Sequence, residues 1–598
     1  MRNYREYMAA LSLFLGGIFA GCEDIKFGEA FLEKPLSNEY TIDSVFNKKI
    51  FAEQALAEAY HSLPDFLPSQ GRMGYGVLEI LTDIGDWTKK GAPKFYTGTV
   101  DATNDFLEHL PYRPDTDKNT RGVGPIYGLR RAYIYLENVD RVPDMSDEEK
   151  AFGKGEAKMI IAYHYVQMLR YYGGMPWIDH AYTAGDEMMM PRMTVQETVE
   201  KIVGLLDEAA ALLPWEWKNH ADDDGRMTAA AALALKSRVL QFAASPLFNA
   251  EKPYKEGEAA SAHLVWYGNY SSERWQKALD AGLSFLRENN KHGGIYRLVN
   301  TGNPREDFVA GYFKRNNHET LISSRRFTTY MIGKTPFAQI RYGVASPTLN
   351  YVDMFQMNDG TEFDWNNPDH KKNPFFDASG HPRRDIRLYE TVAVTGDKFR
   401  GQQKVEIYEG TQQYPYKSGR MSYNGFAMRK FIRNFNEEVN GEPYICPLLR
   451  LPEVYLNMAE AMNELGKANV ADEFGHTAYD YVNLVRSRAG MPPLTAATTR
   501  QGEPLREAIL RERALEFGYE EVRYFDLVRW KRSDLFTKPL SRLIIKKAGK
   551  NYTYKVSTAM AEQRKHVRPD RWDEKYFLLP LPISEINKKY GLTQNPGW

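Results

Sequence analysis

The last third of the chain carries the feature that most constrains its fold, an amphipathic helical pattern followed by two more. Arg450–Gly466 repeats apolar residues at spacings of three and four and ends at a glycine. A second helix is expected to end within Asn483–Gly490, before a pair of prolines, and a third to start near Pro504 and continue through Leu505–Arg532. Three consecutive helices joined by short loops predict a stacked helical array.

The third of these helices carries carboxylates on its apolar face. Glu512 and Glu516 fall on the same side as Ile509 and Leu515, so burial of this face would bury charge unless cations meet it. The candidate cations are Arg486, Arg488, Arg523 and Arg529. We interpret the pattern as an internal ion-pair lattice that fixes helix register, because no nucleophile or metal-ligand set lies alongside it.

Paired helical patterns also fill the first half of the chain. They cover Asn47–Leu63, Val123–Val142, Asp147–Tyr172, the run that starts at Thr194, Arg226–Ala244 and Ser272–Asn289. Thr194 and Glu197 have the spacing of a capping box. Each helix pair can hide its apolar face only by stacking on the next pair, so the pattern predicts a mainly α fold of tetratricopeptide-like stacked pairs, an α-α superhelix.

The middle of the chain is irregular. From Asn290 to about Ile445 helical periodicity is lost, glycine, proline and asparagine become frequent, and short β-like runs such as ETLISSRRF and KVEIYEG occur. We expect an irregular, loop-rich subdomain with short β segments laid on the helical array. The predicted organisation is 1–21 signal peptide, 22–289 N-terminal helical region, 290–445 loop-rich subdomain and 446–598 C-terminal helical region.

The N-terminus reads as an export signal. Arg2 and Arg5 precede an apolar run, Met8–Phe19, that is too short to span a bilayer core of ~30 Å. Phe19–Cys22 resembles a bacterial lipobox, which implies that Cys22 is lipidated, and the acidic pair after it resembles a signal for the outer face of the outer membrane. An ordinary secreted protein cut near residue 21 is the alternative. With only two cysteines in the chain, we expect an exported protein that folds without a disulfide.

Composition narrows the possible ligands. The 78 basic residues balance the 78 acidic ones, and the two kinds are interspersed, which argues against nucleic acid as a ligand. Aromatic residues make up 13% of the chain, and they suit stacking on sugar rings as well as ordinary core packing.

Two regions could offer aromatic side chains to a ligand. The glycine-broken segment after the first helix is expected to place Asp83, Asp86, Trp87 and Tyr96 on an exposed loop, although Trp87 could instead fill a gap between helices. In the irregular subdomain the candidates are Phe327, Tyr330, Tyr342 and Trp365, each of which could also be a core residue. Only a cluster on one surface would favour binding.

Motifs for metals, cofactors and catalysis are weak. Ala221–Gly225 and Asn358–Asp369 hold closely spaced oxygens that could bind calcium, but neither keeps the spacing of an EF-hand loop, and Asx turns explain both equally well. We therefore expect no cofactor. No G-x-S-x-G, H-E-x-x-H or P-loop pattern occurs. A glycosidase would need two facing carboxyl groups ~5–9.5 Å apart, and no pair is set apart in the sequence.

Four blocks of the C-terminal third resemble one family. The blocks RLPEVYLNMAEAMNELG, NLVRSRAG, ERALEFGYEEVRYFDLVRW and YFLLPLPISEINKKYGLTQNPGW look like the C-terminal signature of the SusD/RagB family, and Gly155–Ile178 and Arg226–Asn249 resemble its helices. The resemblance implies a surface-exposed lipoprotein that binds a nutrient, usually a glycan, and lids a SusC-like TonB-dependent barrel. Peptide binding, a pure protein-interaction scaffold and, more remotely, a glycoside hydrolase remain as alternatives.

The resemblance also implies where the ligand binds. It puts Trp87, with Asp83 and Asp86, near a second wall on the exposed face. That wall would consist of Phe327, Tyr330 and Tyr342 with Arg325, Arg326 and Arg341. We expect a shallow surface site in which Trp87→Ala weakens glycan binding at least about tenfold while leaving thermal stability nearly unchanged.

Overall fold

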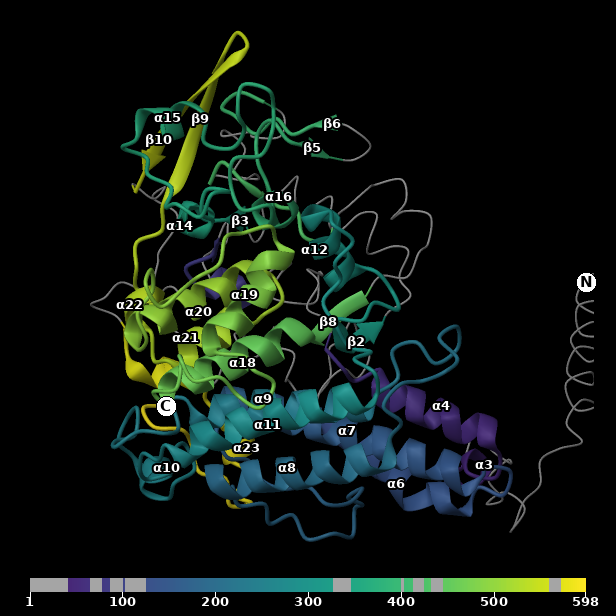
Figure 1. The fold of residues 1–598 in the computed structure, drawn as a ribbon. Coiled ribbons are helices and arrows are strands. Elements are labelled where there is room, and N and C mark those ends of the chain that lie inside the picture. Colours follow the sequence, from purple (N-terminus) through teal and green to yellow (C-terminus); the bar gives the residue numbers. More distant parts are fainter. Residues whose placement is uncertain are drawn as a thin grey trace, which may run out of the picture.

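The computed structural model describes residues 41–64, 78–86, 101–102, 125–325, 346–399, 403–411, 424–431, 445–558 and 572–598. Within these residues the chain is mainly helical. Figure 1 shows a lower layer of long helices, a second group of helices above it, and short helices and strands at the top.

The long helices pack one after another in chain order. They are α4 (Lys49–Tyr60), α6 (Pro125–Asn138), α7 (Asp147–Tyr172), α8 (Val195–Leu212), α9 (Ala229–Ala244), α11 (Glu273–Lys291), α18 (Leu451–Glu464) and α19 (Ala478–Arg488). Each contacts the next, although α11 and α18 are separated by the whole irregular subdomain. Because each helix buries its apolar face on its neighbours, the array is the predicted tetratricopeptide-like stack, and this prediction is confirmed.

Local sequence signals define the ends of these helices. The capping box predicted for Thr194 and Glu197 is present at the start of α8, and Ser146 and Glu149 make another at the start of α7. Gly466 and Gly490, which follow α18 and α19, have φ angles of 72° and 71°. A left-handed backbone is costly for residues with a Cβ, so glycine is the residue that ends these helices.

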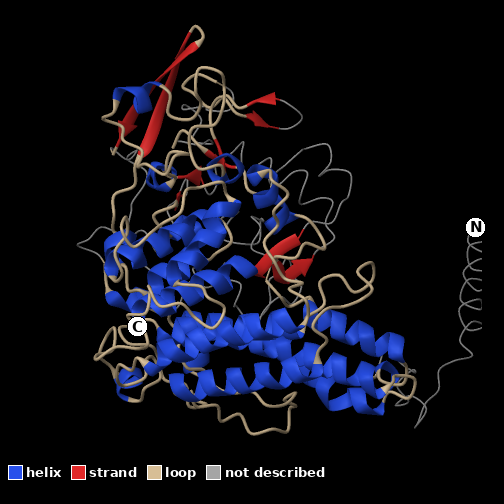
Figure 2. Cartoon of the chain, viewed as in Figure 1, coloured by secondary structure: helices blue, strands red, loops and turns tan. Residues whose placement is uncertain are grey.

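The irregular part consists of short elements (Figure 2). Its helices are α12 (Pro304–Phe313), α14 (Leu349–Met354), α15 (Pro368–Lys372) and α16 (Arg387–Thr391). The strands pair as antiparallel couples. The longer couples are β2 (Thr320–Arg325) with β8 (Ile445–Arg450) and β9 (Arg542–Ala548) with β10 (Asn551–Ser557). The shorter ones are β1 (Gly85–Asp86) with β3 (Ser346–Pro347), β4 (Val392–Ala393) with β7 (Ala427–Met428), and β5 (Lys398–Phe399) with β6 (Gln403–Lys404).

The third C-terminal helix is not continuous, contrary to expectation. It divides into α20 (Glu503–Phe517) and α21 (Arg523–Arg529). Tyr351 donates its hydroxyl to the Ala514 carbonyl at 3.0 Å, and that oxygen is the one that Gly518 N–H would use if the helix continued. A Cβ at Gly518 would lie 2.0 Å from the same hydroxyl. A side chain from a distant segment therefore ends α20, and sequence periodicity alone does not reveal this.

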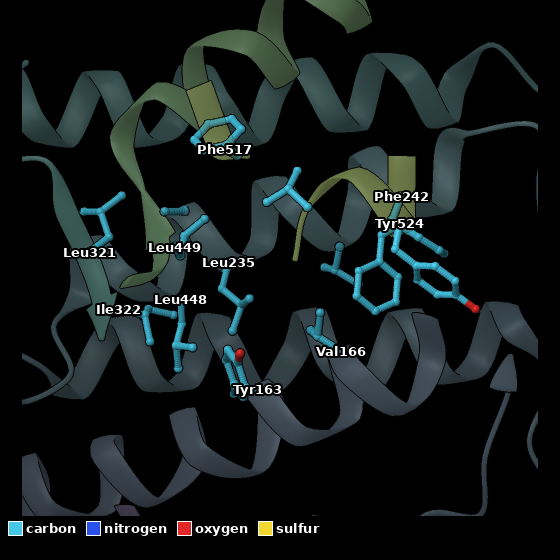
Figure 3. Packing of buried hydrophobic residues seen from close by; sticks show 14 of the residues in the cluster. Tyr163, Val166, Leu235, Phe242, Leu321, Ile322, Leu448, Leu449, Phe517 and Tyr524 are labelled. Carbon is cyan, nitrogen blue, oxygen red and sulfur yellow. The ribbon is translucent and has the colours of Figure 1, made fainter. Parts of the chain in front are cut away.

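One hydrophobic core joins the two groups of helices. Figure 3 shows Tyr163 and Val166 of α7, Leu235 and Phe242 of α9, Leu321 and Ile322 of β2, Leu448 and Leu449 of β8, Phe517 of α20 and Tyr524 of α21 around one interior. Cys446 lies in β8 and is fully buried. The β2–β8 pair contacts α9, so the turn before β2 takes its position from the helical array.

The predicted ion-pair lattice is present, and it is larger than expected. Arg486 Nη1 lies 3.1 Å from Glu512, and Arg488 pairs with Glu516, as predicted. Two arginines that were not predicted also join: Arg387 reaches Glu512 at 2.6 Å, and Arg450 reaches Glu516 at 2.9 Å. All of these side chains are buried, so each charge depends on its partners.

The other two candidate arginines belong to different pairs. Arg523 binds Asp83, while Arg529 binds Glu460 and Asp526. Their assignment to Glu512 and Glu516 is therefore wrong. Both arginines lie in α21, beyond the break after α20.

Candidate functional site

A polar cleft of about 370 Å³ lies beside β2, at the boundary between the helical array and the irregular part. Its walls come from the α8–α9 loop, the segment that follows α11, and the turn before β2, which Figure 1 labels next to β8. The lining residues are Glu216, Trp217, His220, Asp223, Asp224, Gly225, Arg226, Thr228, Ile295, Tyr296, Asn316, Asn317, His318, Thr320, Leu321, Ser323 and Ile445. This volume falls in the range of small-ligand sites.

Trp217 provides the larger aromatic surface of the cleft. Its indole Nε1 donates to the Met227 carbonyl at 2.9 Å, and its ring meets Phe152 edge to face at 5.2 Å. The Arg226 guanidinium lies 3.7 Å from its ring centroid. The side chain is half-buried and held in one orientation, and Arg226 covers one face of its ring.

Tyr296 is the second aromatic residue of the lining. Its ring packs against Trp215, and its hydroxyl lies 3.3 Å from the Trp215 carbonyl. Its backbone is held by Asn289, whose side-chain amide bonds both its N–H and its carbonyl. Burial raises the pKa of Tyr296 to about 12, so the phenol stays protonated at neutral pH.

The turn before β2 supplies further polar groups to the lining. Asn317 uses its side chain to hold this turn, accepting from the N–H groups of Glu319 and Thr320 at 2.8 Å each. The turn exposes Asn316 and His318 to the cleft, and Asn316 has a left-handed φ of 53°. Burial, aided by the charge of Arg297, lowers the pKa of His318, so its imidazole is neutral at pH 7.

Carboxylates form the remaining part of the lining. Asp223 accepts from Arg226 at 2.8 Å, and Asp224 accepts from Arg315 Nε at 2.7 Å. Glu216 lies 3.5 Å from the Nε2 of His220. Aromatic rings next to carboxylates, an amide and a neutral imidazole can stack on a sugar ring and hydrogen-bond its hydroxyls.

Two predicted site residues, Asp83 and Asp86, lie in the interior. They are 1% and 2% exposed, so the expectation of an exposed loop is wrong for them. Asp83 is bound by both Nε and Nη2 of Arg523, and Asp86 accepts from Asn424 at 3.3 Å. Burial of these carboxylates is compensated by the side chains they bind, which sequence spacing does not show.

Trp365 packs beneath the β9–β10 hairpin. Its Nε1 donates to Asp353 at 3.0 Å, and its ring lies 4.8 Å from Phe363 and 6.5 Å from Tyr554. Burial raises the pKa of Asp353 to about 6. Trp365 is half-buried and packs against the core, and its role in ligand binding stays a prediction.

The other predicted site residues, Cys22, Trp87, Tyr96, Phe327, Tyr330 and Tyr342, lie outside the described residues. Phe327 and Tyr330 follow β2 closely in the chain, and β2 borders the cleft.

The two acidic segments considered for calcium are turns and caps. In the first, Asp223 and Asp224 are paired with arginines. In the second, Asp359 accepts from Thr361, and Asn367 caps α15. Among the described residues, no group of three or more histidine, cysteine, aspartate or glutamate side chains is arranged to hold a metal ion.

Trp217 and Tyr296 are not among the site residues predicted from the sequence. The signal that points to Trp217 is the run PWEWKNHADDDG, a loop with two tryptophans before an acidic turn and a capped helix. The prediction from the sequence uses only the acidic end of this run, Ala221–Gly225, as a possible calcium site. Tyr296 has no comparable local signal, because it reaches the cleft through the packing of α11 against α9.

Two stretches of the chain match models of known protein families. The model of the SusD family matches residues 308–598, and the model described as starch-binding associating with outer membrane matches residues 111–240. The two ranges do not overlap and together cover more than half of the chain. The chain belongs to the SusD-like family.

Individual relatives and solved structures of SusD-like proteins are also similar to this chain. A SusD-like protein of Bacteroides ovatus is 24% identical over 521 residues, which cover 86% of this chain and 81% of that protein. The crystal structure of a SusD-like carbohydrate binding protein from Bacteroides fragilis has a TM-score of 0.65 at 20% identity, covering 91% of this chain and 99% of that one. Surface glycan-binding protein A from Bacteroides fluxus gives 0.58 at 18%, covering 92% and 100%. At these identities the likeness to the solved structures shows a shared fold.

Proposed function

We propose that this protein binds oligo- or polysaccharide without catalysing a reaction, at the outer face of the outer membrane, and delivers it to a SusC-like TonB-dependent barrel. The observation that carries glycan binding is the cleft, where Trp217 and Tyr296 stand beside groups that can bind hydroxyls. The SusD-like scaffold supports the same function, since relatives with this fold are described as carbohydrate-binding.

The geometry suggests moderate affinity. The cleft is open to solvent and most of its polar groups are half-exposed, so each sugar hydroxyl exchanges water for protein with a small net gain. We expect micromolar to millimolar dissociation constants, roughly −4 to −8 kcal/mol. Trp87, Phe327, Tyr330 and Tyr342, which lie outside the described residues, remain predicted glycan-binding residues.

Calorimetry with a polysaccharide panel tests the proposal. Trp217→Ala should weaken binding at least about tenfold, since stacking on one aromatic ring accounts for more than about 1.4 kcal/mol. The matched control is Trp266→Ala, because Trp266 is also half-buried and donates its Nε1 to a carbonyl, that of Ala260. It lies outside the cleft lining.

A second variant protects the test against misfolding. Asn316→Gly removes an amide from the cleft but keeps a residue that adopts left-handed φ without strain. It should weaken glycan binding several-fold with an unchanged melting temperature. Unaltered binding in both Trp217→Ala and Asn316→Gly would contradict the cleft as the glycan site.

Delivery requires a membrane-spanning partner. Among the described residues no helix is both long and apolar enough to cross a bilayer. We propose that a SusC-like barrel fills this role, and extraction in mild detergent followed by affinity purification should recover a large barrel protein with this chain. Recovery without any such partner would contradict delivery but not glycan binding.

The competing functions give different results. A glycoside hydrolase would release reducing ends from a bound polysaccharide, whereas a binding protein leaves the polymer intact. A peptide-binding protein would bind a peptide library in the same cleft and ignore sugars. We expect intact polymer and sugar binding, because aromatic rings interleaved with hydroxyl-binding groups suit sugars.

A further inference from the structure

The charges around the cleft are unevenly available to a ligand. The arginine in the lining, Arg226, is already committed. Its Nε and Nη2 donate to Glu156 at 3.0 and 2.7 Å, and its Nη1 donates to Asp223 at 2.8 Å. Its flat face rests on Trp217. Each of its nitrogens therefore has a carboxylate partner, and little of its charge remains for an acidic ligand.

The carboxylates are in a different position. Glu216 is part of the lining, and its partner His220 is an imidazole rather than a permanent cation. Glu156, which is fully buried, adds a second negative charge behind Arg226. Asp223 and Asp224 balance the arginines beside them. The described lining therefore holds three carboxylates, Glu216, Asp223 and Asp224, and one arginine, Arg226.

We propose that the cleft selects glycans that carry no carboxylate or sulfate group, and that a sugar amine strengthens binding through Glu216. This inference rests on the proposed function and names its ligand class. An acidic sugar would meet the half-exposed carboxylate of Glu216, while Arg226, the arginine of the described lining, is already bound to Glu156 and Asp223. Hydroxyl and ammonium groups are donors, and carboxylates accept from them.

The test uses polysaccharides in matched pairs, in affinity gels at low salt. One pair is methyl-esterified and de-esterified polygalacturonate, another is dextran and dextran sulfate, and chitosan compared with its N-acetylated form tests the amine. For pairs that bind at all, the acidic member should bind at least about tenfold more weakly than the neutral one. Chitosan should bind more tightly than its N-acetylated form.

Variants at Glu216 connect the preference to the cleft. Glu216→Gln should reduce the difference in affinity between the neutral and the acidic member of a pair several-fold. Glu216→Lys should reduce this difference further or reverse it. Asp222→Asn is the matched control, because Asp222 lies in the same loop, is exposed and is outside the lining. It should leave this difference unchanged.

Three results would overturn the inference. One is equal or tighter binding of the acidic members, which would mean that a cation outside the lining, such as the exposed Arg297 next to His318, binds the ligand. Another is a difference in affinity between neutral and acidic polysaccharides that Glu216→Gln leaves unchanged, since the preference for neutral glycans would then arise from other residues. The third is binding of no polysaccharide of either kind, which would overturn the proposed function itself rather than the charge preference alone.

Discussion

Arg523 and Asp83 form a two-point ion pair, with Nε 3.0 Å from Oδ1 and Nη2 2.8 Å from Oδ2. The two residues are 440 positions apart, and both are buried. The pair ties the segment after the short helix Leu78–Leu81 to α21 and so joins the N-terminal part of the chain to its C-terminal helices.

Removing one side of this pair should destabilise the fold. Asp83→Asn leaves the Arg523 guanidinium buried without its countercharge, so we expect the free energy of unfolding to fall by about 3–5 kcal/mol. Urea denaturation measures it. The control is Glu208→Gln, which breaks an exposed pair with Lys158 and should cost less than about 1 kcal/mol. If Asp83→Asn weakened glycan binding with unchanged stability, Asp83 would belong to the ligand site instead.

The free energy of unfolding should depend on pH through the carboxyl group of Glu516. Burial by itself would raise the pKa of this carboxyl, but Arg488, Arg450 and Arg387 outweigh burial and hold it well below its usual value. A depressed folded pKa means that the stabilisation is complete above about pH 5 and is lost as the pH falls through the unfolded value toward the folded one.

Glu516→Gln should therefore lower stability at pH 7 and flatten the loss of stability below about pH 5. Urea unfolding as a function of pH measures both effects. Glu288→Gln, which affects an exposed pair with Lys291, should keep the wild-type pH dependence. An unchanged acid limb in Glu516→Gln would contradict the electrostatic role of this residue.

Two helical glycines should respond to alanine in opposite directions. A Cβ at Gly128 in α6 would lie 2.3 Å from both Ser62 Oγ and His164 Nε2, which are buried and bonded to each other at 2.8 Å. Gly128→Ala should cost about 1–3 kcal/mol through overpacking. Gly204 in α8 is exposed, with no neighbouring atom within 4 Å of an added Cβ, so Gly204→Ala should add about 0.5–1 kcal/mol. Melting temperatures of the two variants check the signs.

Membrane attachment should depend on Cys22. If this cysteine carries the lipid anchor, Cys22→Ala should release the protein from the outer membrane, because stable anchoring needs at least two acyl chains. Membrane fractionation with palmitate labelling measures it. Label and membrane association that persist in the variant would contradict lipidation at Cys22.

The sequence predicts the helices of this protein better than it predicts the residues of the candidate site. Thr194 and Glu197 bond each other across one turn, so the start of α8 follows from four adjacent residues. The end of α20 depends on Tyr351, which is more than 150 residues away in the chain, so local periodicity predicts a helix that continues too far. Asp83 has the sequence context of a loop carboxylate, and only the fold shows its ion pair with Arg523. Trp217 is one of many aromatic residues in the sequence, and only the fold places it in the same cleft lining as residues of β2.

The sequence by itself determined the helical array, the caps of its helices, the need for buried arginine–glutamate pairs and the family signature, because these depend on spacings of a few residues. The tertiary structure alone decided which arginine meets which carboxylate, where α20 ends, and that Trp217, Tyr296 and the turn before β2 enclose one cleft. These outcomes depend on contacts between segments far apart in the chain. The free energy of such a contact comes from burial and from the charge of both partners, and neither partner's local sequence contains the other.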